Sequence, residues 1–264
     1  MIALLNQIPS EAKIKKFLKQ TVFGKNLFCP HCHSRKVYCS ENRYRCQTCR
    51  QPFSLLSGTW LSNCKLSLRT LWALLWCWTQ RVPVKQSSKL CHLSEVSVYH
   101  WFRQFRLHLP VFEPILQGQV QMDEAYFKGL SLLMAKQVGS KNVAHQIIFK
   151  NSVNKQETAN FLFQYIQPKS VLQTDGAGIY RGINHWWQVK HKKDIHKNFE
   201  FGLTSEIEGM FGNLRTFIRR MYHHTTPEYL PEYVSEFCLR FSSPEIFDSP
   251  NDYLAKTLKS VPTC

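Results

Sequence analysis

The chain has 264 residues, of which 44% are hydrophobic and 13% are aromatic. This is ample material for a packed core and excludes a mainly disordered protein, and the length predicts one large domain with a smaller module. Lysine and arginine number 34 against 18 acidic residues, a formal net charge of +16. We expect a polyanionic partner, with a basic but otherwise ordinary soluble protein as the alternative.

The apolar stretches and the cysteines predict a cytoplasmic protein with no membrane segment. Met1–Ser10 lacks a basic region followed by a long apolar run, so it does not resemble a secretory signal. The most apolar stretch, Thr70–Gln80, has eleven residues, which is too short to cross a bilayer. Of the ten cysteines, four form two close pairs and six are scattered, which favours reduced, intracellular cysteines over a secreted disulfide scaffold.

The two close cysteine pairs predict a zinc ribbon. Cys29 and Cys32 form one Cys-x-x-Cys knuckle, Cys46 and Cys49 form another, and thirteen residues separate the two. This spacing lets two short turns converge on one tetrahedral Zn²⁺. Val37–Arg45, between the knuckles, has the alternation of a β-hairpin. The alternatives are two unrelated thiol pairs or a redox motif.

Three helical patterns follow the ribbon, at Leu66–Gln80, Gln86–Cys91 and Ser94–Leu107, and Ser94 is a suitable N-cap for the last. The last two resemble a helix-turn-helix, in which the second helix enters the major groove. A helical pair that only buries apolar residues is the alternative. The residues of the third pattern suited to base edges or phosphates are Tyr99, His100, Arg103 and Arg106.

Two aspartates lie on predicted strands. Gln119–Phe127 reads as a strand in which Asp123 faces away from the apolar positions, so its carboxylate must meet water, a partner or a metal. Val171–Gly176 reads as a short strand that ends in Asp175 and a glycine, and strand ends carry the chemistry of many α/β folds. A solvent-exposed edge aspartate and a simple Asp-Gly turn are the respective alternatives.

The third acid lies on the clearest amphipathic helix of the sequence, within Thr204–Tyr222. We favour Glu208 as the functional residue of this helix. The alternative role for Glu208 is a capping box with Ser205, in which it would satisfy the backbone at the helix start. In that case Glu206 becomes the rival acid.

Asp123, Asp175 and Glu208 together suit a site in which carboxylates hold two Mg²⁺ or Mn²⁺ ions roughly 3.5–4 Å apart. Such a pair activates water or a 3′ hydroxyl and stabilises the leaving oxygen of an in-line displacement at phosphorus. The predicted chemistry is cleavage and joining of DNA without a covalent protein intermediate.

From about Phe28 to Phe241 the chain resembles bacterial insertion-sequence transposases of the ISXO type, which have a zinc ribbon ahead of a ribonuclease H-like DDE core. The motifs that carry the resemblance are Cys-Pro-His-Cys, Tyr-Arg-Cys-Gln-Thr-Cys with Ser57-Gly58-Thr59, Asp123-Glu124-x-Tyr126, Thr174-Asp175-Gly176, Ile207-Glu208-Gly209 and Tyr222-His223-His224.

The resemblance implies that Asp123, Asp175 and an acidic or amide residue near Glu208 bind the catalytic metals. It also implies that a later basic residue contacts DNA, and Arg215 occupies that place. The family usually has lysine at that position and commonly has asparagine where this chain has Ser205. Ser205, Glu206 and Glu208 therefore all remain candidates for the third ligand.

A basic cluster lies between the second and third acids, in His191–Lys197. Its residues Lys192, Lys193 and Lys197 could neutralise DNA phosphates and would make binding strongly dependent on salt. A solvated loop is the alternative.

The sequence therefore predicts three units, which are a zinc ribbon with an N-terminal helix at 1–58, a helical DNA-binding segment at 59–112 and a ribonuclease H-like core at 113–264. The core is expected to be α/β, with a mixed sheet of five strands flanked by helices. The expected cofactors are one structural zinc ion per chain and two catalytic Mg²⁺ or Mn²⁺ ions.

The predicted function is a DNA transposase that cleaves transposon ends and transfers the strands into target DNA. Its partners would be the terminal inverted repeats, target DNA and other copies of the chain, without a membrane, at the nucleoid of a bacterial cytoplasm. The first alternative is a DNA-binding regulator or inactive remnant, which would show no cleavage. The second is a nuclease that nicks DNA without strand transfer.

Overall fold

The computed structural model describes residues 8–40, 43–127, 129–193, 204–223 and 225–258. The chain divides into two compact units, one made of Met1–Pro110 with Glu245–Cys264 and the other of Val111–Pro244. Among the described residues, no helix combines the length and the apolar character that crossing a bilayer requires.

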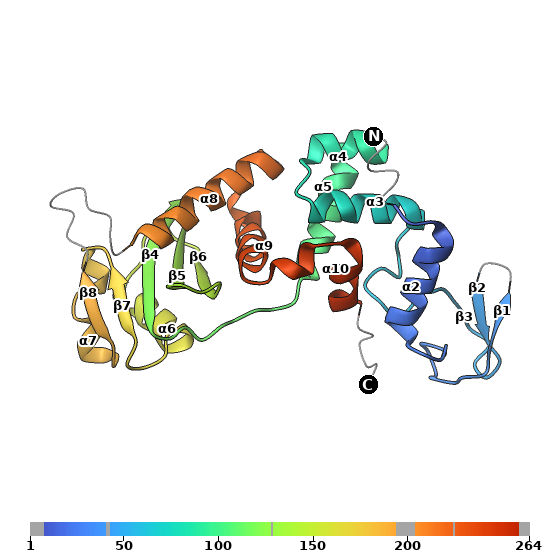
Figure 1. Ribbon diagram of the computed structural model, residues 1–264, viewed down its shortest axis with the longest axis horizontal. Helices are drawn as coiled ribbons and strands as arrows, with labels where there is room; N and C mark the ends of the chain where they lie inside the picture. Colours follow the sequence, from blue (N-terminus) through green and yellow to red (C-terminus); the bar gives the residue numbers. More distant parts are fainter. Residues whose placement is uncertain (1–7, 41–42, 128, 194–203, 224, 259–264) are drawn as a thin grey trace. The chain divides into compact units, whose positions relative to one another are not determined.

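In the described part of the first unit, helix α2 and a small three-stranded antiparallel sheet come first along the chain (Figure 1). Ser10 caps α2, because its side chain accepts from the amide of Lys13. The order β1-β2-β3 and the pairing of Tyr38 with Arg45 confirm the predicted hairpin. The elements are α2 (Glu11–Phe23), β1 (Val37–Ser40), β2 (Arg43–Cys46) and β3 (Pro52–Phe53).

Three helices follow the ribbon sheet in the same unit, close to the predicted ranges. Ser67 caps the first and Ser94 caps the third, each by accepting from a backbone amide three residues on. The turn between the second and third contains His92 in the left-handed conformation. The helices are α3 (Leu68–Thr79), α4 (Val84–Cys91) and α5 (Glu95–Leu107).

The C-terminal helix α10 (Pro250–Thr257) belongs to this first unit, although we expected one catalytic unit to run to residue 264. The reason is aromatic packing, since the rings of Tyr253 and Trp78 lie 5.1 Å apart. The hydroxyl of Tyr253, which is fully buried, also donates to the carbonyl of Phe105 at 2.9 Å. The 3-10 turn Pro244–Phe247 precedes this helix.

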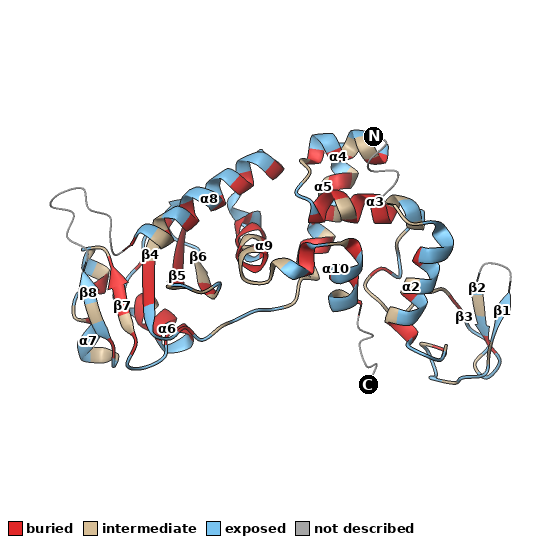
Figure 2. Cartoon of the chain, in the orientation of Figure 1, coloured by how far each residue is buried: buried red, intermediate tan, exposed pale blue. Residues whose placement is uncertain are grey.

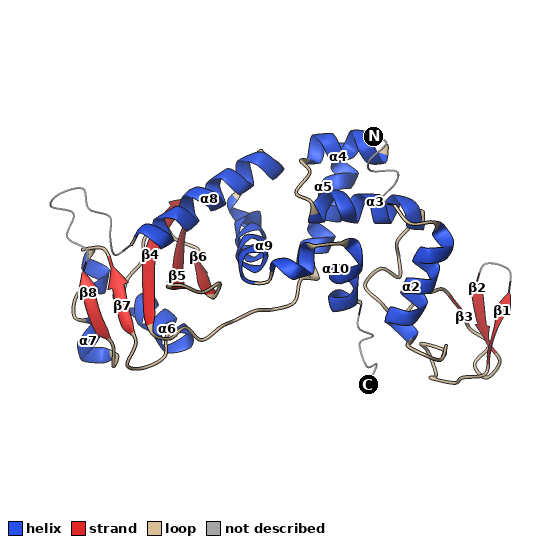
Figure 3. Ribbon diagram, in the orientation of Figure 1, coloured by secondary structure: helices blue, strands red, loops and turns tan. Residues whose placement is uncertain are grey.

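The second unit is built on the five-stranded mixed sheet that the sequence predicted, in the order β6-β5-β4-β7-β8 (Figure 3). β4 pairs antiparallel with β5 and parallel with β7, which in turn is parallel to β8. This is the ribonuclease H-like arrangement. The strands are β4 (Gln119–Phe127), β5 (Leu130–Gln137), β6 (Val143–Ile148), β7 (Val171–Thr174) and β8 (Lys190–Lys193).

Helices cover both faces of this sheet. On one face, Val120 and Met122 of β4 pack with Phe161 of α6 in the hydrophobic core. On the other face, α8 packs on β4 and β5, and α9 packs on β6. The helices are α6 (Lys155–Tyr165), α7 (Ile183–Trp186), α8 (Ser205–Tyr222) and α9 (Leu230–Ser242), with short 3-10 turns at Gly178–Tyr180 and Pro227–Tyr229. Alternate residues of β4 therefore face α6 and α8 in turn.

Candidate functional site

The four predicted cysteines form a compact cluster in the ribbon. Their sulfur atoms lie within 4.8 Å of one another, and both Cys29–Cys49 and Cys32–Cys46 have Sγ–Sγ distances of 3.6 Å. A tetrahedral site with Zn–S bonds of about 2.3 Å has sulfurs about 3.8 Å apart, so the cluster fits a structural zinc ion. Cys29 and Cys46, one from each knuckle, are buried. The sequence prediction of these ligands thus agrees with the geometry.

The two predicted aspartates meet at one edge of the large sheet. β4 and β7 are parallel neighbours, paired from Gln119–Val171 to Gln121–Gln173. Continuing this register by two residues brings Asp175, just past the end of β7, next to Asp123 on β4. Because the carboxyl ends of parallel strands meet at the same edge, acids 52 positions apart in the sequence become neighbours.

A third carboxylate of this cluster, Glu124, was missed in the sequence. One oxygen each of Asp123, Glu124 and Asp175 lie within 4.8 Å of one another. Glu124 faces the α6 side of the sheet, where its carboxylate accepts a hydrogen bond from the hydroxyl of the fully buried Tyr180. Its place beside Asp123 was the available signal, but strand alternation suggested that the two side chains diverge. The tip of the sheet, where Asp175 lies, is within reach of both.

Gln121 fixes the helix that carries the remaining candidate acid. It is 3% exposed and lies on the same face of β4 as Asp123. Its Oε1 accepts from the backbone amides of Glu206 at 2.9 Å and Ile207 at 3.1 Å. The first amides of a helix lack partners within the helix, so this side chain takes the place of an N-cap. It holds the start of α8 against the strand that bears Asp123.

Glu208 lies on the first turn of α8, near Asp123. The capping box with Ser205 does not form, because Thr204 is the N-cap residue and its hydroxyl donates to Oε1 of Glu208 at 2.8 Å. Glu206 is instead paired with the ammonium of Lys136, a residue of β5 that is 6% exposed. Glu208 is not among the carboxylates that lie within 4.8 Å of one another, but its charge acts on Asp123, so it stays our candidate for the third ligand.

The pKa of Asp123 shows how the carboxylates affect one another. Burial is the main cause, and this pKa is raised from its usual range to about 7. The backbone amide of Glu124, which donates to Oδ1 of Asp123 at 2.9 Å, acts in the opposite direction and lowers the pKa. The negative charges of Glu124, Asp175 and Glu208 raise it further. Burial likewise raises the pKa of Glu124, while the Tyr180 hydroxyl lowers it. The site therefore concentrates carboxylates whose charges act on one another.

Basic side chains lie on the elements around the acids. Arg215, two turns after Glu208 on α8, is exposed, and its guanidinium lies 5.9 Å from the ring centroid of Phe127 at the end of β4. Lys192 and Lys193 are exposed on the edge strand β8. Lys197, the other basic residue that we proposed, lies outside the described residues.

The proposed recognition helix, α5, presents only part of its predicted set. His100 and Arg103 are exposed and Tyr99 is half-buried. Arg106 differs from the prediction, because it is 6% exposed and its side chain packs inside the first unit. Helical periodicity explains this, since Arg106 follows the buried Phe102 by four residues and so lies on the same face. Arg106 is therefore removed from the candidate DNA contacts.

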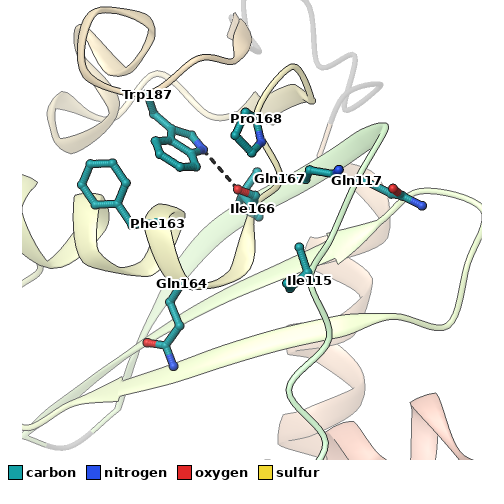
Figure 4. Close-up of a pocket in the computed structure, with 8 residues that line it drawn as sticks. All are labelled: Ile115, Gln117, Phe163, Gln164, Ile166, Gln167, Pro168 and Trp187. Carbon is teal, nitrogen blue, oxygen red and sulfur yellow. Dashed lines mark hydrogen bonds between the residues drawn. The ribbon is translucent and has the colours of Figure 1, made fainter.

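A hollow elsewhere on the second unit lacks the features of a catalytic site. It has a volume of about 410 Å³ and lies at the C-terminal end of α6 (Figure 4). Ile115, Phe163, Ile166, Pro168 and Trp187 line it, together with three glutamines. The indole of Trp187 donates to the carbonyl of Ile166 at 3.2 Å. None of these lining residues is charged, so this hollow is separate from the acidic cluster.

Comparison with known proteins agrees with both clusters. The family described as "ISXO2-like transposase domain" matches residues 115–242, and the one described as "Transposase zinc-ribbon domain" matches residues 9–52. The chain is also 26% identical over 125 residues to an uncharacterized protein in transposable element ISH50 of Halobacterium salinarum. That match covers 45% of this chain and 42% of the relative, so the chain spans less than half of that relative's length.

Two solved structures show a distant likeness. One is the intasome of simian T-cell lymphotropic virus with a PP2A regulatory subunit, at 17% identity and a TM-score of 0.35, covering 50% of each chain. The other is the catalytic core domain of BIV integrase, at 12% identity and a TM-score of 0.34, covering 47% of this chain and 82% of that one. The four cysteines lie in the region that matches a transposase zinc ribbon, and the acids lie in the region that matches an ISXO2-like transposase domain.

Proposed function

We propose that this protein is a metal-dependent DNA transposase that cleaves the ends of its element and joins them to target DNA. One observation carries the proposal, which is that Asp123, Glu124 and Asp175 offer oxygens within 4.8 Å of one another beside Glu208. Partly buried carboxylates that repel one another are costly unless a cation or a proton offsets their charge. Hard divalent cations prefer such oxygen ligands.

Asp123, Asp175 and Glu208 would hold the catalytic Mg²⁺ or Mn²⁺ ions, with Glu124 as an additional carboxylate at the same edge. When bound, such ions supply Lewis-acid stabilisation of the oxygens attacking and leaving phosphorus. The chain's own residues hold the ligands in place. Gln121 anchors the start of α8, and Thr204 donates to Glu208.

Several basic groups would bind the DNA around this site. Arg215 lies on the same helix as Glu208, and Lys192 and Lys193 lie on the edge strand beyond β7. In the first unit, His100 and Arg103 are exposed on α5, and Tyr99 is half-buried there. Contacts of Lys and Arg with phosphates do not depend on sequence, so base recognition would fall to α5. Lys197 stays a prediction.

The four cysteines Cys29, Cys32, Cys46 and Cys49 would hold one structural zinc ion per chain. Because two ends must be brought together before joining, the active form on DNA would contain more than one copy of the chain. Such a protein would work at the nucleoid of a bacterial cytoplasm. The division of the chain into ribbon, helical segment and core remains part of this proposal.

The test is a cleavage and joining assay with the purified full-length chain, DNA carrying the terminal repeats of its element, and Mg²⁺ or Mn²⁺. Asp123→Asn, Asp175→Asn and Glu208→Gln should each lower the cleavage rate by roughly a thousandfold or more, since several kcal/mol of transition-state stabilisation is lost. Glu206→Gln is the matched control, because Glu206 pairs with Lys136. Its metal-dependent cleavage should persist.

The other outcomes separate the rival functions. Binding of the repeats by the wild type without any metal-dependent cleavage would contradict the proposal and leave a regulator or inactive remnant. Nicked products without joined products would leave a nuclease. Cleavage that survives all three acid substitutions would remove the proposed site.

A further inference from the structure

The ribbon sheet has two unlike faces, which the strand register defines. Cross-strand partners point to the same side, so the pairs Tyr38–Arg45 and Ser40–Arg43 lie on one face of β1 and β2. The pair Arg45–Pro52 extends this face to β3. We call the residues Tyr38, Ser40, Arg43, Arg45 and Pro52 the outer ribbon face.

The opposite face of the ribbon sheet is occupied by packing within the unit. Tyr44 and Phe53 stack there with ring centroids 5.5 Å apart, and Cys46 turns inward to the cysteine cluster. The ring of Phe53 in turn packs near the ring of Phe23 on α2, with 6.1 Å between the ring centroids. The sheet therefore uses one face for its own core and leaves the outer ribbon face to solvent.

The outer ribbon face is exposed and positively charged. Arg43 and Arg45 are exposed, Tyr38 is 43% exposed, and β1 is largely exposed along its length (Figure 2). Residues 25–65 contain seven lysines and arginines and one acid, Glu41, which lies outside the described residues. The described part of this stretch thus has no carboxylate to neutralise the two arginines.

We propose that the outer ribbon face binds the phosphate backbone of duplex DNA through Arg43 and Arg45. This inference rests on the proposed function, which makes DNA the partner. The two arginines are two residues apart on one face of β2, so their backbone positions are about 6.6–6.8 Å apart along the strand and their side chains reach separate phosphates. Guanidinium groups bind phosphate oxygens with two parallel hydrogen bonds, and the hydroxyl of Tyr38 can donate beside Arg45.

The ribbon is suited to sequence-independent binding. The cysteine cluster joins the two knuckles at the ends of the hairpin, so a bound zinc ion would hold the arginines on a rigid strand rather than on a loop. Contacts to phosphates position a protein on DNA without reading bases. The outer ribbon face would therefore anchor the first unit while α5 reads sequence.

The experiment measures the affinity of the full-length, zinc-loaded chain for a short duplex of arbitrary sequence over a series of KCl concentrations, without divalent cation. In the double variant Arg43→Gln/Arg45→Gln, the slope of log K against log salt should fall by about 2, near 0.9 per lost phosphate contact. Affinity at low salt should fall roughly tenfold. Arg43→Lys/Arg45→Lys should recover most of the slope.

The matched control removes two charges from α2 of the same unit, as Lys13→Gln/Lys16→Gln, both exposed there. An equal loss of slope in this control would overturn the inference, because net charge alone would then explain the effect. An unchanged slope in the arginine variant with zinc retained would also overturn it.

A second measurement needs no variant and guards against a misfolded ribbon. DNA should protect Arg43 and Arg45 of the wild type from an arginine-modifying dicarbonyl, with the modified peptides quantified by mass spectrometry. Full modification of both in the complex would overturn the inference. Because none of these readouts uses cleavage, either result leaves the test of the transposase activity separate.

Discussion

The cysteine cluster and the acidic cluster of this protein are assembled in opposite ways. The four cysteines lie within 21 consecutive positions, on two knuckles of one small sheet. Strand pairing brings Asp123, Glu124 and Asp175 together, and α8 carries Glu208, whose charge acts on Asp123. A cluster made by a local motif depends mainly on its own ligands. A cluster made by the fold topology also depends on residues that never contact the bound metal ion.

The largest expected effect is on the local cluster. Cys46→Ser should abolish zinc binding and unfold the ribbon, because the apparent free energy of zinc binding in small zinc modules is about 10–16 kcal/mol. Zinc content by mass spectrometry and loss of hydrogen-exchange protection at 29–53 are the measurements. Cys39→Ser, an exposed cysteine of the same hairpin outside the cluster, is the control. Equal zinc content in both variants would contradict the assigned ligands.

The acidic cluster should be weakened by a substitution at Gln121, a residue that would not bind the metal ions itself. Gln121→Met keeps the side-chain size but leaves the part-buried amide of Glu206 and the buried amide of Ile207 without their acceptor. We expect the second unit to lose about 2–4 kcal/mol of unfolding free energy, from two unsatisfied donors, and to bind Mn²⁺ more weakly because Glu208 is no longer held.

Urea unfolding and Mn²⁺ titration measure the two effects of Gln121→Met. Gln119→Met, an exposed position on the same strand, is the control and should change neither. If Mn²⁺ affinity is unaffected while stability falls, Gln121 serves the fold alone.

A smaller effect concerns pH and the packing of α9 on β6. Burial lowers the pKa of His145 from its usual range to about 4, and the ring lies 3.2 Å from the hydroxyl of Ser235 on α9. The unfolded chain takes up this proton near pH 6.5 and the folded one only near pH 4. The stability contributed by neutral His145 is therefore present above pH 6.5 and lost as the pH falls toward 4.

We expect a loss of about 1 kcal/mol between pH 7 and pH 5 from this residue, given its partial exposure. Unfolding midpoints at the two pH values measure it. The variant His145→Gln should be less sensitive to acid than the wild type, whereas His185→Gln, at an exposed position, should match the wild type. If the unfolding midpoint of His145→Gln depends on pH as strongly as that of the wild type, the acid sensitivity does not come from His145.

The sequence was sufficient for the features that depend on local pattern. The Cys-x-x-Cys knuckles, the cap Ser94 and the apolar face of α8 all follow from spacing that is visible along the chain. The strand at Gln119–Phe127 was predicted with its observed bounds. Hydrophobic periodicity and capping chemistry act over a few residues, and so one sequence is enough to find them.

The sequence was insufficient to predict the role of a side chain when that role depends on a partner far away in the sequence. Gln121 caps a helix that begins 84 positions later, and no spacing rule marks such a pair. The sequence favoured Glu208 over Glu206 but could not show that Lys136, on a distant strand, neutralises Glu206. Arg106 was assigned to DNA because of its charge, although its helical phase places it with buried Phe102.

The most direct test of the central claim is a crystal structure of the full-length chain with Mn²⁺, in which anomalous scattering locates the ions. The account predicts Mn²⁺ bound by Asp123 and Asp175, with Glu208 as a further ligand, and the loss of this signal in Asp123→Asn. Mn²⁺ found only elsewhere in the wild type, or carboxylates of Asp123 and Glu208 that bind no common cluster, would contradict it.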